Sequence, residues 1–186
     1  MAGRFSKNIF FDLKDLKHCG ENVIIGKTVR IRQPHLISIG DGSIIDDFTY
    51  ISSALEVGKH CHIASNVSIS GGKGKLSIGD YSTLSTHVSV HCGSSYYRAL
   101  SMDLPSIPEE LQFGGVVENV NIGRFVTVGA HSCILPGAYL PEGSAYGAYT
   151  LVKKNALISY HLYAGYKCVD LGKRVITNME ILEKYK

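Results

Sequence analysis

Hydrophobic residues of this chain return at every sixth position, and a small or polar residue usually follows each of them. This period matches neither the roughly 3.6 residues of an α-helical turn nor the two-residue alternation of a long strand. Short strands joined by tight turns would instead place one apolar side chain inward on each flat face of a coil. The positions are Ile39, Ile45, Ile51, Val57, Ile63 and Ile69, then Ile78, Leu84 and Val90, then Ile122, Val128, Ile134, Leu140, Tyr146 and Val152. The pattern therefore predicts an all-β fold, a parallel β-solenoid.

Glycine often occupies the position after the apolar residue, as in Ile39-Gly40, Val57-Gly58 and Ile122-Gly123. A residue without a Cβ suits a corner where a side chain would clash or φ must be unusual. A β-sandwich is the alternative all-β fold, but it would show turn signals about every 8–12 residues together with polar and apolar alternation. The six-residue period favours the solenoid.

The chain divides into three segments. Residues 1–21 precede the hexads, and residues 8–19 could form a helix or a cap over the open end of the solenoid. Residues 22–157 carry the hexads and are interrupted at 94–119 by a long loop, and loops of that length in a compact fold are usually functional. Residues 158–186 form a C-terminal extension in which 171–186, apolar among charges, are predicted to form a short amphipathic helix.

Composition excludes several classes of protein. Of the 186 residues, 45% are hydrophobic and 19% are charged, and the formal net charge is +3, so neither disorder nor a nucleic acid partner is indicated. The N-terminus lacks the features of a secretory signal, and no apolar run is long enough to span a membrane. Five cysteines without CxxC spacing indicate free thiols. We therefore expect a single-domain cytoplasmic protein without a membrane span or a metal.

Several motifs within the hexads are shared with a known family. They are Ile39-Gly40-Asp41, Ile45-Asp46-Asp47-Phe48, His62-Ile63, Val128-Gly129-Ala130, Ile134-Leu135-Pro136-Gly137 and Leu151-Val152-Lys153-Lys154. With them the chain resembles the hexapeptide-repeat acyltransferases, most closely the branch that O- or N-acetylates sugars of lipopolysaccharide and capsule. The resemblance implies a left-handed β-helix, a homotrimer with active sites between subunits, acetyl-coenzyme A as the donor, and a sugar or nucleotide-sugar acceptor.

The resemblance also assigns the donor site. It implies that small residues line the pantetheine arm of coenzyme A and that basic side chains meet its phosphates. The matching positions are Ala130, Ala148, Lys153, Lys154 and Arg174. A slim thioester arm needs close backbone approach and multiply charged phosphates need Lys or Arg, so these residue types suit the task. The chain departs from the family at Tyr166-Lys167-Cys168 and at Tyr149, which leaves the acyl group open.

Acyl transfer to a hydroxyl or an amine needs a base, and a histidine is well suited to that role near neutral pH. The candidates are His62, His87 and His91, stacked in the solenoid beside Thr83, Asn66 and Ser70 respectively. His62 is the first choice, and it is expected at a corner. Candidate substrate-binding residues are Asp46, Asp47, Asn66, Tyr96 and Tyr97, and the alternatives for the two aspartates are to orient a histidine or to serve as turn residues. Related enzymes carry a histidine or an Asp-Asp-Tyr sequence at the start of the long loop, whereas this chain has Ser95-Tyr96-Tyr97. If the usual residue there is the base or orients it, then His62, His87 or His91 takes over that task, or activity is lost. We expect direct transfer without an acyl-enzyme.

Two other functions suit the same scaffold. A catalytically degenerate homologue could bind coenzyme A or serve as a scaffold, and the altered loop start favours that reading slightly. A γ-type carbonic anhydrase would use histidines around a zinc ion between subunits, with His60, His62, His87 and His91 as the available ligands. The Lys153-Lys154 motif has no task in a carbonic anhydrase, which favours the acyltransferase.

Overall fold

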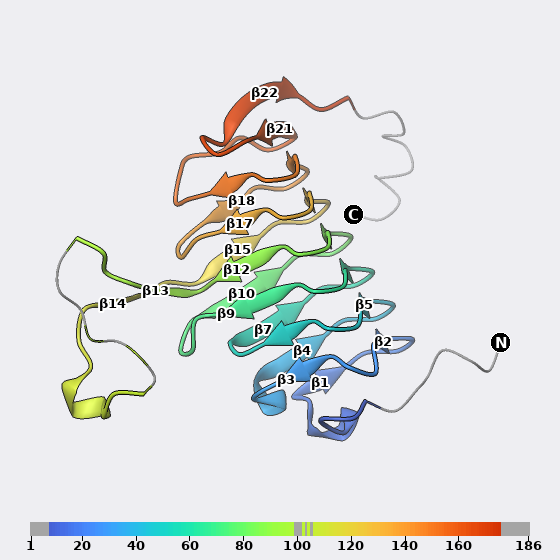
Figure 1. The fold of residues 1–186 in the computed structure, drawn as a ribbon. Coiled ribbons are helices and arrows are strands. Elements are labelled where there is room, and N and C mark those ends of the chain that lie inside the picture. Colours follow the sequence, from blue (N-terminus) through green and yellow to red (C-terminus); the bar gives the residue numbers. More distant parts are fainter. Residues whose placement is uncertain (1–7, 99–101, 103, 105, 176–186) are drawn as a thin grey trace.

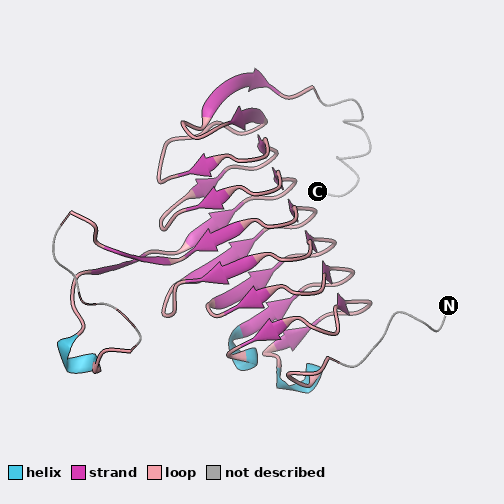
Figure 2. Ribbon diagram, in the orientation of Figure 1, coloured by secondary structure: helices cyan, strands magenta, loops and turns pink. Residues whose placement is uncertain are grey.

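A computed structural model describes residues 8–98, 102, 104 and 106–175, and its chain winds into a solenoid with three flat faces (Figures 1 and 2). Each face is one sheet of parallel strands, to which every coil adds one strand, except that the last strand of sheet B, β22 (Val169–Lys173), runs antiparallel. Sheet A contains β1 (His18–Cys19), β4 (Ile37–Ile39), β7 (Ala54–Val57), β10 (Lys75–Ile78), β15 (Val120–Ile122) and β18 (Tyr139–Leu140). Sheet B contains β2 (Ile24–Ile25), β5 (Ile44–Ile45), β8 (His62–Ile63), β11 (Thr83–Leu84), β16 (Thr127–Val128), β19 (Ala145–Tyr146), β21 (His161–Ala164) and β22 (Val169–Lys173). Sheet C contains β3 (Arg30–Ile31), β6 (Tyr50–Ile51), β9 (Ser68–Ser70), β12 (Ser89–His91), β17 (Cys133–Ile134) and β20 (Leu151–Val152).

The apolar residues of the hexads form the core. In sheet B, Ile45 pairs with Ile63, Ile63 with Leu84, and Leu84 with Val128, so equivalent residues of successive coils lie one above another. These side chains are buried. Burial of such a side chain contributes about 1.5–3 kcal/mol. The six-residue period is therefore the period of the faces, and the predicted solenoid is confirmed.

Glycine after the apolar residue is required by close approach between coils rather than by φ. A Cβ on Gly40 would lie 2.7 Å from the carbonyl carbon of Gly58 in the next coil. Left-handed backbone occurs instead at the third position after the apolar residue, at non-glycine residues such as Phe48 (φ 63°) and His87 (φ 60°). The part of the expectation that concerned unusual φ at these glycines was therefore wrong.

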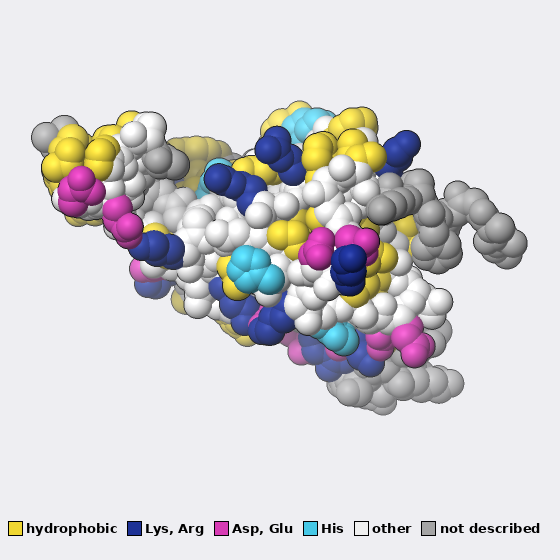
Figure 3. Space-filling model, turned by 90° about the horizontal axis from the view of Figure 1, so that it is seen from below, with side chains coloured by type: hydrophobic (Ala, Val, Ile, Leu, Met, Phe, Trp, Pro, Cys, Tyr) yellow, Lys and Arg dark blue, Asp and Glu magenta, His cyan; other side chains and the backbone are white. Residues whose placement is uncertain are grey.

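The predicted loop leaves the solenoid as an arm, defined here as residues 93–117 (Figure 1). Its root is an antiparallel ribbon of β13 (Gly93–Ser95) and β14 (Gly115–Val117), and a 3-10 turn, η3 (Glu109–Leu111), lies further out. Apolar side chains on it face outward, including Tyr97 at 90% exposure, Leu111 and Phe113. Seen from below, hydrophobic side chains gather over the arm (Figure 3). The described part of the arm is thus a projection with exposed apolar side chains.

Further segments lie at both ends of the described solenoid. At the start, η1 (Leu13–Asp15) and η2 (Pro34–Leu36) flank the first coil, and the Asn8 amide donates to the carbonyl oxygens of Gly26 at 3.0 Å and Val29 at 2.8 Å. At the other end, β22 pairs antiparallel with β21. The predicted helix over 171–186 is therefore wrong at its start, where the chain completes an edge of sheet B, and residues 176–186 lie outside the described residues.

Candidate functional site

One corner of the solenoid, where sheet B turns into sheet C, brings together six of the predicted site residues, namely Asp46, Asp47, Asn66, His87, Ala130 and Ala148. The strands of sheet B end in register at Ile45, Ile63, Leu84, Val128 and Tyr146, so the residues that follow also stack from coil to coil. Three columns result, which we call the B–C corner: Asp46, Ala64, Ser85, Gly129, Gly147; then Asp47, Ser65, Thr86, Ala130, Ala148; then Phe48, Asn66, His87, His131, Tyr149. Separate sequence motifs are thus joined into one continuous surface.

The small residues predicted for the donor site share this corner with three of the predicted substrate-binding residues, Asp46, Asp47 and Asn66. Ala130 and Ala148 are adjacent in the second column, where the backbone N–H of Tyr149 donates to the carbonyl of Ala130 at 2.9 Å. Towards the N-terminus the alanine column continues through Thr86 and Ser65 to Asp47, with Asp46 in the column on one side of it and Asn66 in the column on the other. A narrow molecule lying along the alanines would therefore point one of its ends at the polar residues.

His62 lies beside the corner, on the outward side of β8, and not at the corner itself as expected. It pairs with Thr83 in the register that the hexads predicted. Its Nε2 is 2.8 Å from Oδ2 of Asp46, and both side chains are 44% exposed. An imidazole held by a carboxylate is suited to accept a proton and to carry the resulting charge.

His87 occupies the third column of the corner and takes part in a stack of rings. Its ring lies 4.7 Å from that of His131 at an interplanar angle of 8°, and His131 lies 4.9 Å from Tyr149 at 5°. His131 is not among the residues predicted from the sequence, although it stands at the same position in its hexad as His87 does in its own. The shared hexad position was the signal that could have found it.

His91 lies on a different face. It ends β12 in sheet C, pairs with Ser70 in the predicted register, and has its Nδ1 3.1 Å from the Ser70 hydroxyl. Burial lowers the pKa of His91. The three candidate histidines therefore occupy a sheet face, a corner and a second sheet face. Within the residues that the structure describes, no group of three His, Cys, Asp or Glu side chains could hold a metal ion.

The basic donor candidates already have partners. Nζ of Lys153 lies 5.5 Å from the ring centre of Tyr166, and Nζ of Lys154 lies 3.1 Å from each carboxylate oxygen of Glu118. Arg174 donates from Nη1 to the carbonyl oxygen of Gly143 at 2.6 Å. That contact lies at the corner between sheets A and B, so Arg174 is separated from the column of Ala130 and Ala148. Its guanidinium group binds the backbone of that corner.

The carboxylates of Asp46 and Asp47, which begin the first two columns, contact residues of different neighbouring coils. Asp46 contacts His62 of the following coil, whereas Oδ1 of Asp47 accepts from the backbone N–H of Thr28 at 2.7 Å and from its hydroxyl at 2.6 Å in the preceding coil. The Thr28 hydroxyl and N–H lower the pKa of Asp47. Of the other substrate candidates, Asn66 lies in the corner, and Tyr96 and Tyr97 lie on the arm.

Asp47→Ala should lower the free energy of unfolding at pH 7 by about 1–3 kcal/mol, because two donors of Thr28 lose their acceptor. Since folding holds the pKa of Asp47 below its ordinary 3.8, its contribution is complete above that pH and is lost as the pH falls through the lower folded value. Thermal unfolding should therefore separate the variant from the parent at pH 7 and bring them together in strong acid. Glu21→Ala, at an exposed side chain, is the control. Unchanged stability with lost turnover would show instead that Asp47 binds substrate.

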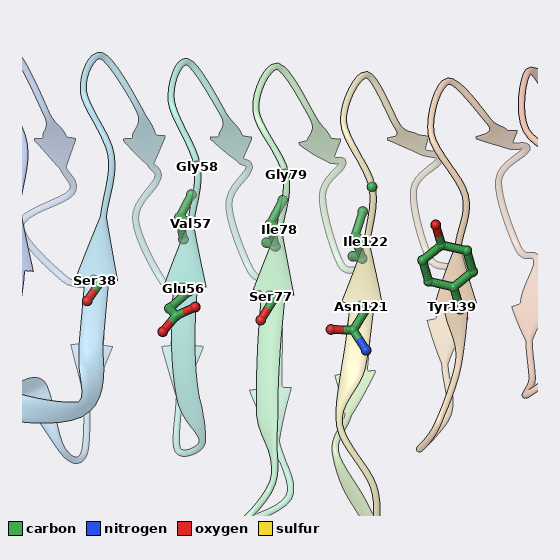
Figure 4. A pocket seen from close by; sticks show the side chains of 11 residues that line it. Ser38, Glu56, Val57, Gly58, Ser77, Ile78, Gly79, Asn121, Ile122 and Tyr139 are labelled. Atoms are coloured by element: carbon green, nitrogen blue, oxygen red, sulfur yellow. The ribbon is translucent and has the colours of Figure 1, made fainter.

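A second hollow lies on the outer side of sheet A (Figure 4). This open groove of about 470 Å³ is floored by one row of outward side chains from successive strands, namely Ser38, Glu56, Ser77, Asn121 and Tyr139. Nζ of Lys75 pairs with Glu56 at 2.6 Å. The groove offers hydrogen-bonding groups, but it is on another face from His62 and the B–C corner.

Comparisons with known proteins agree with this architecture. A scan against models of protein families found no match. The chain is 37% identical over 145 residues to a dTDP-4-amino-4,6-dideoxy-D-glucose acyltransferase of Escherichia coli, covering 75% of this chain and 73% of the relative. It superposes with a TM-score of 0.85 on AntD, an N-acyltransferase from Bacillus cereus solved with dTDP and 3-hydroxybutyryl-CoA, at 27% identity over 96% of both chains. A hexapeptide-repeat acetyltransferase from Vibrio cholerae, VCA0836, shares the fold at a TM-score of 0.58 and 16% identity, over 88% of this chain and 74% of that one.

The three-sided solenoid of hexads, together with the similarity to these acyltransferases, identifies a coenzyme A-dependent acyltransferase. The chain belongs to the hexapeptide-repeat acyltransferases. The left-handed β-helix that the sequence resemblance implied is thereby confirmed. No helix in the described part of the chain is long and apolar enough to cross a membrane.

Proposed function

We propose that this enzyme transfers a small acyl group from coenzyme A to the amino group of a dTDP-linked amino sugar. The observation that carries the proposal is the B–C corner, where the column of Ala130 and Ala148 lies next to the column that contains Asp46, the carboxylate in contact with His62. Support for the acceptor comes from the relatives, one named for dTDP-4-amino-4,6-dideoxy-D-glucose and one solved with dTDP and an acyl-CoA. N-acylation is favoured over O-acylation because AntD is an N-acyltransferase.

The proposed reaction is a direct attack. The lone pair of the sugar amine forms a bond with the thioester carbon, the C–S bond breaks, and coenzyme A leaves as its thiol. His62 takes the proton from the nitrogen and returns it to the departing sulfur, so the residue ends each turnover neutral. Backbone N–H groups at the corner would stabilise the oxyanion. Lys153 and Lys154 would meet the phosphates of the donor, and Lys154 would then exchange its contact with Glu118 for one with phosphate.

We further propose a homotrimer in which the arm covers the site of a neighbouring copy. The uncovered apolar side chains of the arm, Tyr97 and Phe113 among them, support this arrangement, because a projection of this kind gains by packing against another surface. Tyr96 and Tyr97 would then reach the acceptor from the next subunit. Five free cysteines are consistent with work in the cytoplasm on precursors of surface polysaccharide or lipopolysaccharide.

Purified enzyme mixed with dTDP-4-amino-4,6-dideoxyglucose and either acetyl-CoA or 3-hydroxybutyryl-CoA provides the test. Mass spectrometry should show the acylated sugar nucleotide, and thiol release should match it one to one. Light scattering on the same sample should give the mass of three chains. Coenzyme A binding without product from these or other amino and hydroxyl sugars would favour the degenerate homologue instead.

A further inference from the structure

The contact between Asp46 and His62 is specific for one nitrogen of the imidazole. Nε2 lies 2.8 Å from Oδ2 of Asp46. A carboxylate accepts hydrogen bonds and does not donate them, so the imidazole must carry a hydrogen on Nε2. In the neutral ring the lone pair is then on Nδ1. The structure therefore implies which nitrogen is free to accept a proton.

The backbone holds Asp46 in place for this contact. Its N–H donates to the carbonyl of Ile63 at 2.8 Å, and Ile45 immediately before it is buried in the core and pairs with Ile63. The carboxylate thus leaves a fixed point on one coil and reaches the residue before Ile63 on the next. Asp47 cannot take its place, because its carboxylate is bound to Thr28 on the opposite side.

We propose that Asp46 is a positioning residue that fixes His62 with its proton on Nε2, so that Nδ1 receives the proton of the sugar amine. This rests on the proposed function of the enzyme. As the C–N bond forms and the C–S bond breaks, Nδ1 gains the proton and the ring becomes an imidazolium, while Asp46 accepts a charge-assisted hydrogen bond from Nε2. The proton then passes from Nδ1 to the sulfur of coenzyme A, which restores the starting tautomer. Asp46 itself neither gains nor loses a proton.

The chain contains an internal reference of the opposite kind. His161 on β21 contacts the carboxylate of Asp170 on β22 through Nδ1, at 2.8 and 3.0 Å. By the same reasoning its neutral ring carries the hydrogen on Nδ1. Two His–Asp pairs in one protein should therefore show opposite tautomers, which makes the assignment of His62 measurable against a standard in the same sample.

Nuclear magnetic resonance on the ¹⁵N-labelled full-length chain would test this above the titration range of imidazole. Long-range ¹H–¹⁵N spectra, assigned with His62→Ala, should show His62 protonated on Nε2 and His161 protonated on Nδ1. Asp46→Ala should leave His62 as a mixture of tautomers and lower kcat at least about tenfold with little change in KM for the sugar nucleotide, because the wrong tautomer cannot accept the proton. Asp46→Glu should restore part of the Nε2-protonated population of His62 and part of kcat. The matched control, Asp170→Asn, should alter only the His161 signals.

The possible failures are distinguishable. A spectrum in which His62 carries its hydrogen on Nδ1 overturns the inference, and so does an Asp46→Ala enzyme with normal kcat. An enzyme with the expected tautomers that acylates no dTDP-linked amino sugar overturns the proposed function instead, since the geometry would then be right and the reaction wrong.

Discussion

Replacement of His62 by alanine is expected to lower kcat by about two to four orders of magnitude while coenzyme A binds as before. The loss follows from the absence of a proton acceptor beside the corner, and the unchanged binding follows from the position of Ala130 and Ala148 on later coils. Steady-state kinetics with a dTDP-linked amino sugar gives kcat, and calorimetry with coenzyme A gives Kd. Both measurements use the same protein preparation.

The control for this variant is His35→Ala. His35 lies in η2 at the start of the solenoid and is exposed, so its removal should change neither kcat nor Kd. If His62→Ala retains near-normal turnover, the base is elsewhere. His87 would then be the next candidate because it shares the corner with the alanine column, and His91 on sheet C would follow.

Leu84→Ala is expected to lower the free energy of unfolding by about 2–5 kcal/mol. Leu84 is completely buried in the middle of sheet B, with Ile63 against it in one neighbouring coil and Val128 in the other. Removal of its side chain leaves a cavity between two coils that the ladder of hydrogen bonds prevents from closing. Denaturant titration followed by circular dichroism measures the change.

Leu171→Ala is the matched control, because this leucine is 59% exposed in β22 and its loss should change stability by less than about 0.5 kcal/mol. A solenoid is stabilised by contacts between adjacent coils, so a lesion in a central coil separates two halves of the core. If Leu84→Ala unfolds like the parent, the packing assigned to the hexads would be wrong.

The six-residue period was sufficient to predict the fold, because the same spacing determines both which residue faces inward and which residues stack. It also predicted that His62 lies beside Thr83 and His91 beside Ser70, which the register confirms. It was less informative about outward side chains. A column position does not fix a rotamer, so the opposite directions of Asp46 and Asp47 could not be read from the sequence.

Residues at the end of the solenoid were the least predictable. The mixture of apolar and charged residues from Leu171 onward is compatible with a helix or with an exposed strand. In the described part of the chain these residues form a strand, because the edge of β21 is available for pairing. The charge of Arg174 is visible in the sequence and is the basis of its predicted phosphate contact, whereas its contact with the carbonyl oxygen of Gly143 depends on the path of the backbone, which the sequence does not show.

The reversed direction of β22 has a consequence for how this molecule could be lengthened or could polymerise. A further coil could add its strand to sheet B only by pairing in parallel with the edge of β21. That edge is already paired with β22, which runs antiparallel and carries Asp170 and Lys173. Charged edge strands resist pairing with another chain, so this side of the molecule should not seed fibres. Extra rungs introduced by design would have to be inserted between existing coils, upstream of His161.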